Sequence, residues 1–576
     1  MLTNFYPKDY SYDLSTDTIA NIGLVVAGNN KTFGTKGVSN STLTGRQWGF
    51  APRIGLVWAP SQVKNITIRA GFGIYYDRGE FFSEFSPSAG LGISGPFGVT
   101  TELPFASPVN ATCVGVKCFN APFGTGPLPP PPQNLNQLKA LIYNQSQLSG
   151  CTEPVTPTCS PSNTPSLAYL FGSYDPANKL PYSENWSLDL QWQPYNTLLF
   201  SLAYLGNHGV HEVLPIPFNQ PAIATPQHPV NGQIYSYGYQ AIDSNYNPLL
   251  TEQVQTTIGE YTGADGNTAL RVPYIGYNPN SDFWEAEGIS NYNALQFQLT
   301  KRLSQGLQIN FSYTWSHSLD EQSGLGLFFN GNNPLDPRSS YASSDFDRTH
   351  VFVINYLYQF PHADWAKGFL NHVVNGWSFN GITTLESGQP FTVYDFSGSV
   401  GGIYYSADDF ITNPVLPLNS GVTPGQAQTQ GTTGVNAGKP YFNPGVFSIP
   451  LLKPGQSGVP PCGLTTAGTT VCDNSETGFG ATGRNVFRAP FQARWDFSLQ
   501  KMFKLNERFN LKYELDVFNL FNHPSFDAPT NNVTLNPCYN PNPCYVNPPP
   551  STQNIGFITD TLGGPRFIQM ALHLIF

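Results

Sequence analysis

Residues 293–316 contain the pattern that most restricts the fold of this chain, two alternating runs joined by a tight turn. In both runs, 294–301 and 307–316, apolar and aromatic residues alternate with glutamine, asparagine, serine or threonine, except that Ala294 begins the polar set and Lys301 ends the apolar one. Strict alternation over about ten residues is the signature of a β-strand that has one apolar and one polar face. The turn, 303–306, is short and contains glycine, so the two runs predict a β-hairpin.

The composition of the two faces indicates where such a hairpin would lie. Its polar face carries amides and hydroxyls in place of the usual charges, and its apolar face ends in Tyr313 and Trp315. Strands of a membrane barrel have this character, because lipid covers one face, water wets the other, and aromatic rings lie at the headgroups. About nine to eleven tilted residues cross the hydrocarbon. A hairpin of a soluble sandwich or propeller shares the alternation and stays open as an alternative.

Composition narrows the class of protein further. Only 11% of the 576 residues are charged, against a usual share of about 25%, and 14% are aromatic. The sequence contains no run of 18 or more apolar residues, which excludes a helical membrane protein but is typical of barrel strands. The net charge of -10 argues against nucleic acid as a partner. No signal peptide is visible at the N-terminus.

The strand pattern recurs along the chain and predicts an all-β, antiparallel transmembrane β-barrel. Eleven strands are expected, at 53–58, 66–76, 186–192, 198–204, 293–301, 307–316, 350–358, 377–385, 495–503, 509–517 and 568–576. Short connections (60–65, 194–196, 303–306, 506–507) alternate with long ones (77–181, 207–290, 318–348, 522–565). Outer-membrane barrels sort their connections in this way, into short periplasmic turns and long extracellular loops.

This orientation can be checked against individual side chains. Lys301 and Lys501 fall beside periplasmic turns, where a long side chain can reach water. Aromatic residues gather at both rims, in two girdles, and Phe576 ends the last strand at the inner rim. The alternation also predicts a set of lumen-facing residues. This set comprises Arg69, Gln298, Asn310, Lys512 and Glu514.

The cysteines all fall in predicted extracellular loops. They form four close pairs: Cys113 and Cys118, Cys151 and Cys159, Cys462 and Cys472, Cys538 and Cys544. Even numbers of cysteines in an oxidising compartment favour disulfides that staple loops. A zinc site is the alternative, but the C-x2-C spacing that it would want is absent.

Two groups of polar residues could form sites. His208 and His211 follow a strand end and could hold a metal, although a third ligand is not evident. Asp336, Asp345, Asp347 and Arg348 precede the strand at His350. A calcium site is conceivable there, but the spacing lacks the EF-hand pattern, and an ion-pair network between loop and rim is the favoured interpretation.

The remaining residues give no sign of catalysis. Asp408 and Asp409 are most simply a solvated loop, and serine and histidine occur without a Gly-x-Ser-x-Gly elbow. We therefore expect no enzyme, no cofactor and no catalytic residue.

Several short segments resemble the C-terminal barrel of Oar-like TonB-dependent receptors. They are APRIG (51–55), IRAGFGIYYD (68–77), YNALQ (292–296), YTWSHS (313–318), SDFDR (344–348), GW (376–377), SGQPF (387–391), GRN (483–485) and FNLFNHP (518–524). The resemblance spans residues 51–576 in the expected order. It implies a barrel of 22 strands with an N-terminal plug, TonB-driven uptake of a large solute, and Phe576 as the signal read by the barrel assembly machinery.

The sequence departs from that family in one respect. Eleven strands is an odd number, whereas single-chain bacterial barrels are even and closed, and neither plug nor TonB box is found. We therefore expect part of a barrel of about 10–12 strands, a fragment of a longer receptor in which residues 1–49 are a loop region and 50–576 the barrel. TonB would act only through the missing plug.

Three functions remain open. The first is a receptor that binds an unknown solute on its loops for energy-coupled uptake across the bacterial outer membrane. The second is a surface adhesion or structural protein that the barrel anchors in outer-membrane lipid. A soluble secreted binding protein is a weaker third.

Overall fold

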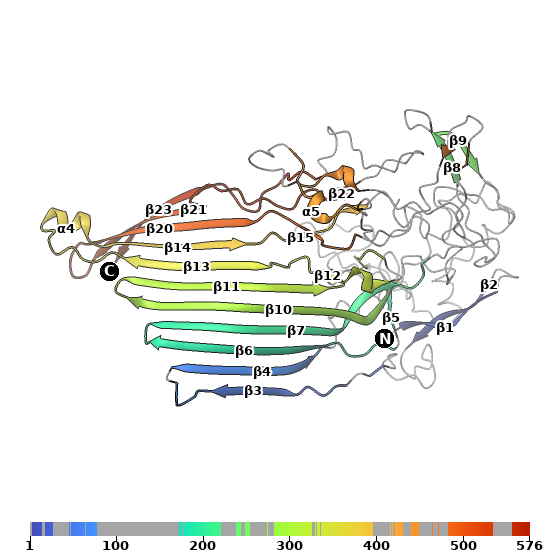
Figure 1. Ribbon diagram of the computed structural model, residues 1–576, viewed down its shortest axis with the longest axis horizontal. Coiled ribbons are helices and arrows are strands. Elements are labelled where there is room, and N and C mark those ends of the chain that lie inside the picture. Colours follow the sequence, from blue (N-terminus) through green and yellow to red (C-terminus); the bar gives the residue numbers. More distant parts are fainter. Residues whose placement is uncertain are drawn as a thin grey trace, which may run out of the picture.

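A computed structural model shows an antiparallel meander of long strands (Figure 1). It describes residues 3–13, 18–26, 45–77, 172–220, 238–242, 248–253, 273–274, 282–324, 329–395, 415–429, 439–447, 463–464, 470–471, 482–533 and 556–576, apart from 47, 64, 176, 330, 334–335, 416–417 and 419–420.

The main sheet contains the predicted strands, which lie side by side in chain order (Figure 1). They are β3 (Arg53–Trp58), β4 (Ile66–Tyr76), β6 (Tyr182–Tyr195), β7 (Leu198–Pro217), β10 (Asp282–Ser304), β11 (Leu307–Asp320), β13 (His350–Gln359), β14 (Trp377–Glu386), β20 (Gln492–Lys504), β21 (Asn510–Phe518) and β23 (Phe567–Ile575). Within the described ranges, β3 and β23 each pair on one side only, so the sheet is open, as the odd strand number predicts.

Short and long connections lie at opposite ends of the sheet (Figure 1). The β10–β11 turn shows why the short ones are tight. Ser304 pairs with Leu307, which leaves Gln305 and Gly306 as the two central residues, both with positive φ. Positive φ at both positions is the requirement of a type I′ turn, whose twist matches that of the strands. The β13–β14 connection lies at the same end and carries helix α4 (Phe369–Val374).

Smaller elements belong to the long connections and the N-terminal segment. Strands β5 (Gly172–Tyr174) and β12 (Ala342–Ser343) pair with β10 and β11. Five separate strand pairs complete the described part of the fold: β1 (Thr3–Asp13) with β2 (Thr18–Val26), β8 (Gly238–Ile242) with β9 (Pro248–Gln253), β15 (Pro390–Phe391) with β19 (Phe487–Arg488), β16 (Tyr394–Asp395) with β22 (Asn532–Val533), and β17 (Gly463–Leu464) with β18 (Thr470–Val471).

The prediction of a loop region for residues 1–49 misses β1 and β2. Their pairing shifts register between Phe5 and Tyr10, where Pro7, Lys8 and Asp9 interrupt the alternation. Because the sequence signal of a strand is unbroken alternation, this pair leaves little trace in it.

The apolar face of the main sheet is exposed. Leu572 is 67% exposed, and Phe311 and Leu499 are partly exposed. A soluble sandwich would bury such residues between two layers. Aromatic rings run across this outer face from strand to strand, with neighbouring centroids 4.9 to 6.4 Å apart, through Trp192, Phe200, Phe297, Phe311 and Phe352.

Candidate functional site

The polar face of the sheet, called the inner face below, carries polar side chains that lie opposite one another in several strand pairs, with apolar residues such as Val353 and Ile382 between them. Directly opposite residues of an antiparallel pair share a face. Arg69 lies opposite Asp189, Gln298 opposite both Ser201 and Ser312, and Asn310 opposite Asn355. These pairings place Arg69, Gln298 and Asn310 on the inner face, as their alternation predicts.

Ion pairs and hydrogen bonds connect the inner-face side chains of β20, β21 and β23. The Lys512 ammonium lies 2.9 Å from a carboxylate oxygen of Glu514, and His573 Nε2 lies 3.4 Å from that oxygen. Gln500 Nε2 donates to the other oxygen of Glu514 at 2.8 Å. Lys512 and Glu514 therefore occupy the inner face, as predicted.

Two lysines of the outer face lie at the short-turn end of the sheet, as predicted, but Lys501 is only 2% exposed and so does not reach water as expected. Lys301 Nζ donates to the carbonyls of Ser304 and Leu307 at 3.0 and 2.8 Å. Lys501 Nζ donates to the Asn375 carbonyl and lies 4.8 Å from the centroid of the Phe503 ring. Both ammonium groups are thus satisfied by the turns themselves.

The described parts of the β14–β20 and β21–β23 connections pack together at the far end of the sheet, in a structure called the loop cap below. Its core of buried residues comes from the β14–β20 connection and comprises Phe391, Val393, Ala427, Tyr441, Phe442, Phe447, Phe487 and Ala489. Ala528 and Ile558, from the β21–β23 connection, pack against it. Phe391 and Phe487 stack with centroids 5.5 Å apart, and Phe442 meets Phe447 edge to face at 5.6 Å. Figure 1 shows α5 (Pro424–Ala427), β15 and β22 gathered at this end.

A buried arginine fastens the loop cap to the sheet. Arg484, 3% exposed, forms an ion pair with Asp320 at the end of β11. Its guanidinium also donates to the Ser340 carbonyl at 3.1 Å and to Asp345 at 3.1 Å. Asn485 Nδ2 donates to Asp345 at 2.6 Å. A buried arginine is tolerated because its donors are directed at oxygen acceptors.

A second arginine repeats this arrangement. Arg488 lies 2.7 Å from the buried carboxylate of Asp347, whose other oxygen accepts from the Ser318 backbone N–H at 2.8 Å. Arg348 forms an ion pair with Glu386 at 3.7 Å. The predicted network between loop and rim is therefore confirmed for Asp345, Asp347 and Arg348.

Asp336 lies outside this network, since it precedes the short helix η4 (Pro337–Ser340) and its carbonyl accepts from Ser339. Arg484 itself was not singled out from the sequence as an ion-pair partner. The sequence signal that could have identified Arg484 is the GRN segment (483–485), which is part of the family resemblance but was given no role.

The two histidines have different surroundings. His208 Nδ1 lies 2.9 Å from the Ser290 carbonyl. His211, the extra residue of a bulge in β7, has positive φ, and its ring meets that of Tyr182 at 5.7 Å. Within the described ranges, no three His, Cys, Asp or Glu side chains gather to hold a metal ion.

The outer ends of β7 and β10 continue beyond the length that crosses a bilayer. A spanning segment needs about ten residues from the turn at Gly306, so residues 282–293 of β10 lie outside it. Trp284 is fully buried there, and the side chain of Asn178 pairs with the β10 backbone, accepting from Ala286 N–H at 2.7 Å. Burial, with smaller effects of Glu287 and Asp175, raises the pKa of the Glu285 carboxyl to about 7.

Several predicted residues fall where the structure gives no placement. Cys113, Cys118, Cys151, Cys159, Cys462, Cys472, Cys538, Cys544, Asp408 and Asp409 lie outside the described residues. Phe576 is 91% exposed at the short-turn end, with its ring 6.4 Å from that of Phe509. The disulfides and the assembly signal stay predictions.

These features define an outer-membrane barrel protein with a folded cap at one end. The chain belongs to the outer membrane beta barrel domain family, whose model matches residues 1–569. It is therefore a protein of the bacterial outer membrane. Among the helices that the structure describes, none has the length and apolarity to cross a bilayer. No curated protein matches the chain.

The solved structures to which the chain is similar are distant in sequence. The outer membrane transporter YddB from Escherichia coli is 8% identical, with a TM-score of 0.34, over 91% of this chain and 40% of that one. The siderophore receptor PirA from Acinetobacter baumannii is 9% identical, with a TM-score of 0.30, over 82% of this chain and 37% of that one. A variant of the ferric enterobactin receptor PfeA from Pseudomonas aeruginosa is 10% identical, with a TM-score of 0.33, over 91% of this chain and 40% of that one. The chain thus spans about two fifths of the length of these structures.

Proposed function

We propose that this chain forms barrel strands of an Oar-like TonB-dependent receptor, which binds a solute on its long-loop side for energy-coupled uptake. The observation that carries the proposal is the loop cap, which has a buried core and ion pairs to the sheet at its long-loop end. A folded cap beside a polar wall can select a solute and pass it to water enclosed by the barrel. The chain's role is binding and passage rather than catalysis.

The polar inner face supports passage of a hydrophilic solute. Its amides, hydroxyls and ion pairs offer hydrogen bonds along the wall, whereas an anchor would need only the apolar outer face. Coupling to TonB would act through a plug domain, which the resemblance implies and which is part of the proposal.

The test is a deletion of the chromosomal gene, with its full natural reading frame. Cells are given a defined mixture of iron chelates, oligosaccharides and oligopeptides, and the loss of each solute from the medium is measured. We expect at least one solute to be taken up by wild-type cells only, and only while TonB is present. The restored gene should return uptake to its original rate.

Two outcomes would overturn the proposal. If the deletion changed the uptake of no solute, the transport role would be removed. Attachment to surfaces that is lost while uptake persists would assign the protein to adhesion, with the barrel as its anchor. Uptake that needs the gene but not TonB would contradict energy coupling alone.

A further inference from the structure

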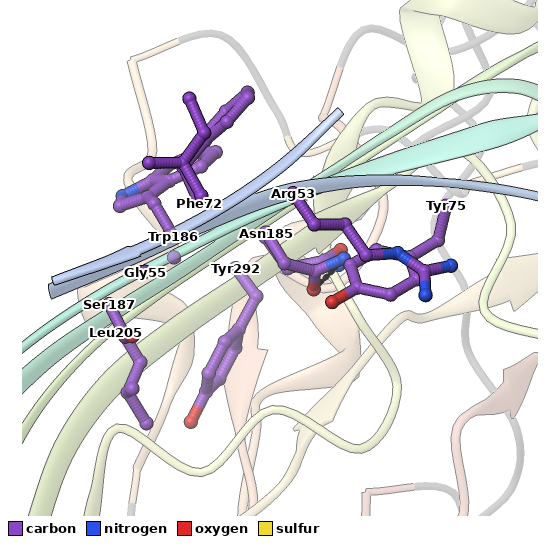
Figure 2. A pocket seen from close by; sticks show the side chains of 14 residues that line it. Arg53, Gly55, Phe72, Tyr75, Asn185, Trp186, Ser187, Leu205 and Tyr292 are labelled. Carbon is purple, nitrogen blue, oxygen red and sulfur yellow. Dashed lines mark hydrogen bonds between the residues drawn. The ribbon is translucent and has the colours of Figure 1, made fainter. Parts of the chain in front are cut away.

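The inner face has a hollow of about 560 Å³ where five neighbouring strands, β3, β4, β6, β7 and β10, meet (Figure 2). Tyr292 and Leu205 project from one side of these strands, whereas Phe72 and Trp186 project from the other. The hollow therefore lies beside the outer aromatic face without being part of it. None of the features of the proposed function assigns it a role.

Three glycines of β3 and β4 line the hollow, of which Gly55 faces open space, whereas the side chains of Ser187 and Tyr75 lie over Gly71 and Gly73. Gly55 lies opposite Gly71, and Gly73 lies opposite Arg53. A Cβ at Gly55 would meet nothing within 4 Å, so open space exists above this position. Glycine weakens a strand and often marks a place where a ligand approaches the backbone. Among the described residues, no side chain fills the space over Gly55, so a ligand can approach the backbone there.

One cation faces this recess. The Arg53 guanidinium lies over the Tyr75 ring, 4.5 Å from its centroid, and Figure 2 shows the two side chains together. No aspartate or glutamate is among the residues that line the hollow. Stacking on a ring occupies the face of the guanidinium and leaves its edge N–H groups to bind an oxyanion in a forked geometry. In a chain with a net charge of -10, this is a locally positive site.

Neutral polar groups lie beside the cation. Asn207 Nδ2 donates to Asn185 Oδ1 at 2.6 Å, and Asn185 Nδ2 donates to Ser183 at 3.1 Å. This chain of bonds fixes both amides and leaves the Asn207 carbonyl oxygen as an acceptor for a hydroxyl group. Ser187 and Tyr292 add hydroxyls to the lining.

We infer that the hollow binds a small hydroxylated oxyanion, such as a sugar acid or sugar phosphate. Arg53 holds the anionic group, and the amides of Asn185 and Asn207 hold the hydroxyls. The inference rests on the proposed function, because it names the class of solute that the inner wall would bind. The volume of the hollow is in the range that holds one small ligand.

The test measures binding to the purified full-length chain in detergent by calorimetry. The probes are galacturonate and glucose 6-phosphate, with galactose and glucose as neutral counterparts. We expect both anions, or one of them, to bind, and the neutral sugars to bind at least about tenfold more weakly. A preference between carboxylate and phosphate identifies the source of the oxyanion.

Two variants examine the residues that carry the inference. Arg53→Gln should weaken binding of the anion at least about tenfold. Arg69→Gln is the matched control, since Arg69 lies on the same face outside the hollow, and it should bind as the natural chain does. A Cβ at Gly55 meets nothing within 4 Å, so we expect Gly55→Val to keep the fold and to abolish binding by occupying the hollow. Circular dichroism confirms that each variant folds.

The inference is overturned if neither anion binds the natural chain, if neutral sugars bind equally, or if Arg53→Gln and Arg69→Gln have the same affinity. Its failure differs from that of the proposed function. Binding that depends on Arg53, without TonB-dependent uptake in cells, would retain the site and remove the transport role. Uptake that persists unchanged in Arg53→Gln cells would retain the transport role and remove the role of the site.

Discussion

At the scale of the residue, two arginines hold together segments that are far apart in the sequence. The Arg484 guanidinium donates to the backbone carbonyl of Asp320, 164 residues away in the sequence, and both residues are buried. A buried ion pair adds little net stability by itself, but removal of one partner leaves an uncompensated buried charge. The geometry of each arginine therefore matters more than the number of ion pairs.

Replacement of Arg484 should detach the loop cap from the sheet. Arg484→Met removes the guanidinium that neutralises the buried carboxylate of Asp320 and that also donates to Asp345, and we expect a loss of about 3–5 kcal/mol in the stability of the cap. Limited proteolysis of the purified chain should then cleave the β14–β20 connection faster than in the natural chain. Arg494→Met, at an exposed ion pair with Asp496, is the control and should change stability by less than about 1 kcal/mol. Equal cleavage of both variants would refute this role for Arg484.

The carboxyl of Glu285 should make the outer end of β10 sensitive to pH. Its pKa is raised from 4.5 to about 7, so the folded state binds more protons than the unfolded state between these values. Its contribution to stability is therefore fully present below about pH 4.5 and is lost as the pH rises through about 7. Glu285→Gln should stabilise this end at pH 8, by up to about 3 kcal/mol, and have little effect at pH 4.

Hydrogen-exchange protection factors of residues 282–293 give the measurement. Glu507→Gln, at an exposed position of the β20–β21 turn, is the control and should leave protection unchanged at both values. If protection in the Glu285→Gln variant kept the pH dependence of the natural chain, another group would be responsible.

At the scale of the element, the sequence predicts the strands and hairpins that are determined by local residue patterns. The hairpins around Gly306 and Asn65 follow from alternation and from turn residues that tolerate positive φ, and both are local signals. The outer end of β10 was not predicted, because the side chain of Asn178, 108 residues away, pairs with its backbone. The loop cap was not predicted for the same reason, since residues of the β21–β23 connection pack against a core from the β14–β20 connection.

The requirement of the β10–β11 turn for glycine at position 306 can be tested by adding one methyl group. Gly306 has φ of 77°, and a Cβ there would lie 2.4 Å from the Gln359 carbonyl oxygen. Gly306→Ala should therefore destabilise the folded chain by about 1–3 kcal/mol, through backbone strain and this contact. Gly55→Ala is the matched control, because its new methyl group meets open space. Urea unfolding in lipid vesicles compares the two, and equal midpoints would show that the turn tolerates a side chain.

At the scale of the whole molecule, the sheet separates two solvents. One face carries the aromatic rings from Trp192 to Phe352, and the other carries amides, hydroxyls and ion pairs. The sequence predicts this separation because a period of two assigns every residue to one face. The hollow beside Arg53 was not predicted, because it depends on glycines and polar residues of five strands that only the pairing brings together.

The assignment of the two faces is tested most directly by one charge placed on either side of the same strand. Leu299 and Gln298 are neighbours near the middle of the spanning part of β10, and they face lipid and lumen respectively. Leu299→Lys should cost about 2–4 kcal/mol of stability in vesicles, because a cation at the bilayer midplane loses its hydration. Gln298→Lys should cost less than about 1 kcal/mol, since enclosed water solvates the ammonium group. If the costs were reversed, the inner and outer faces would have to be exchanged, and the hollow beside Arg53 would open to lipid.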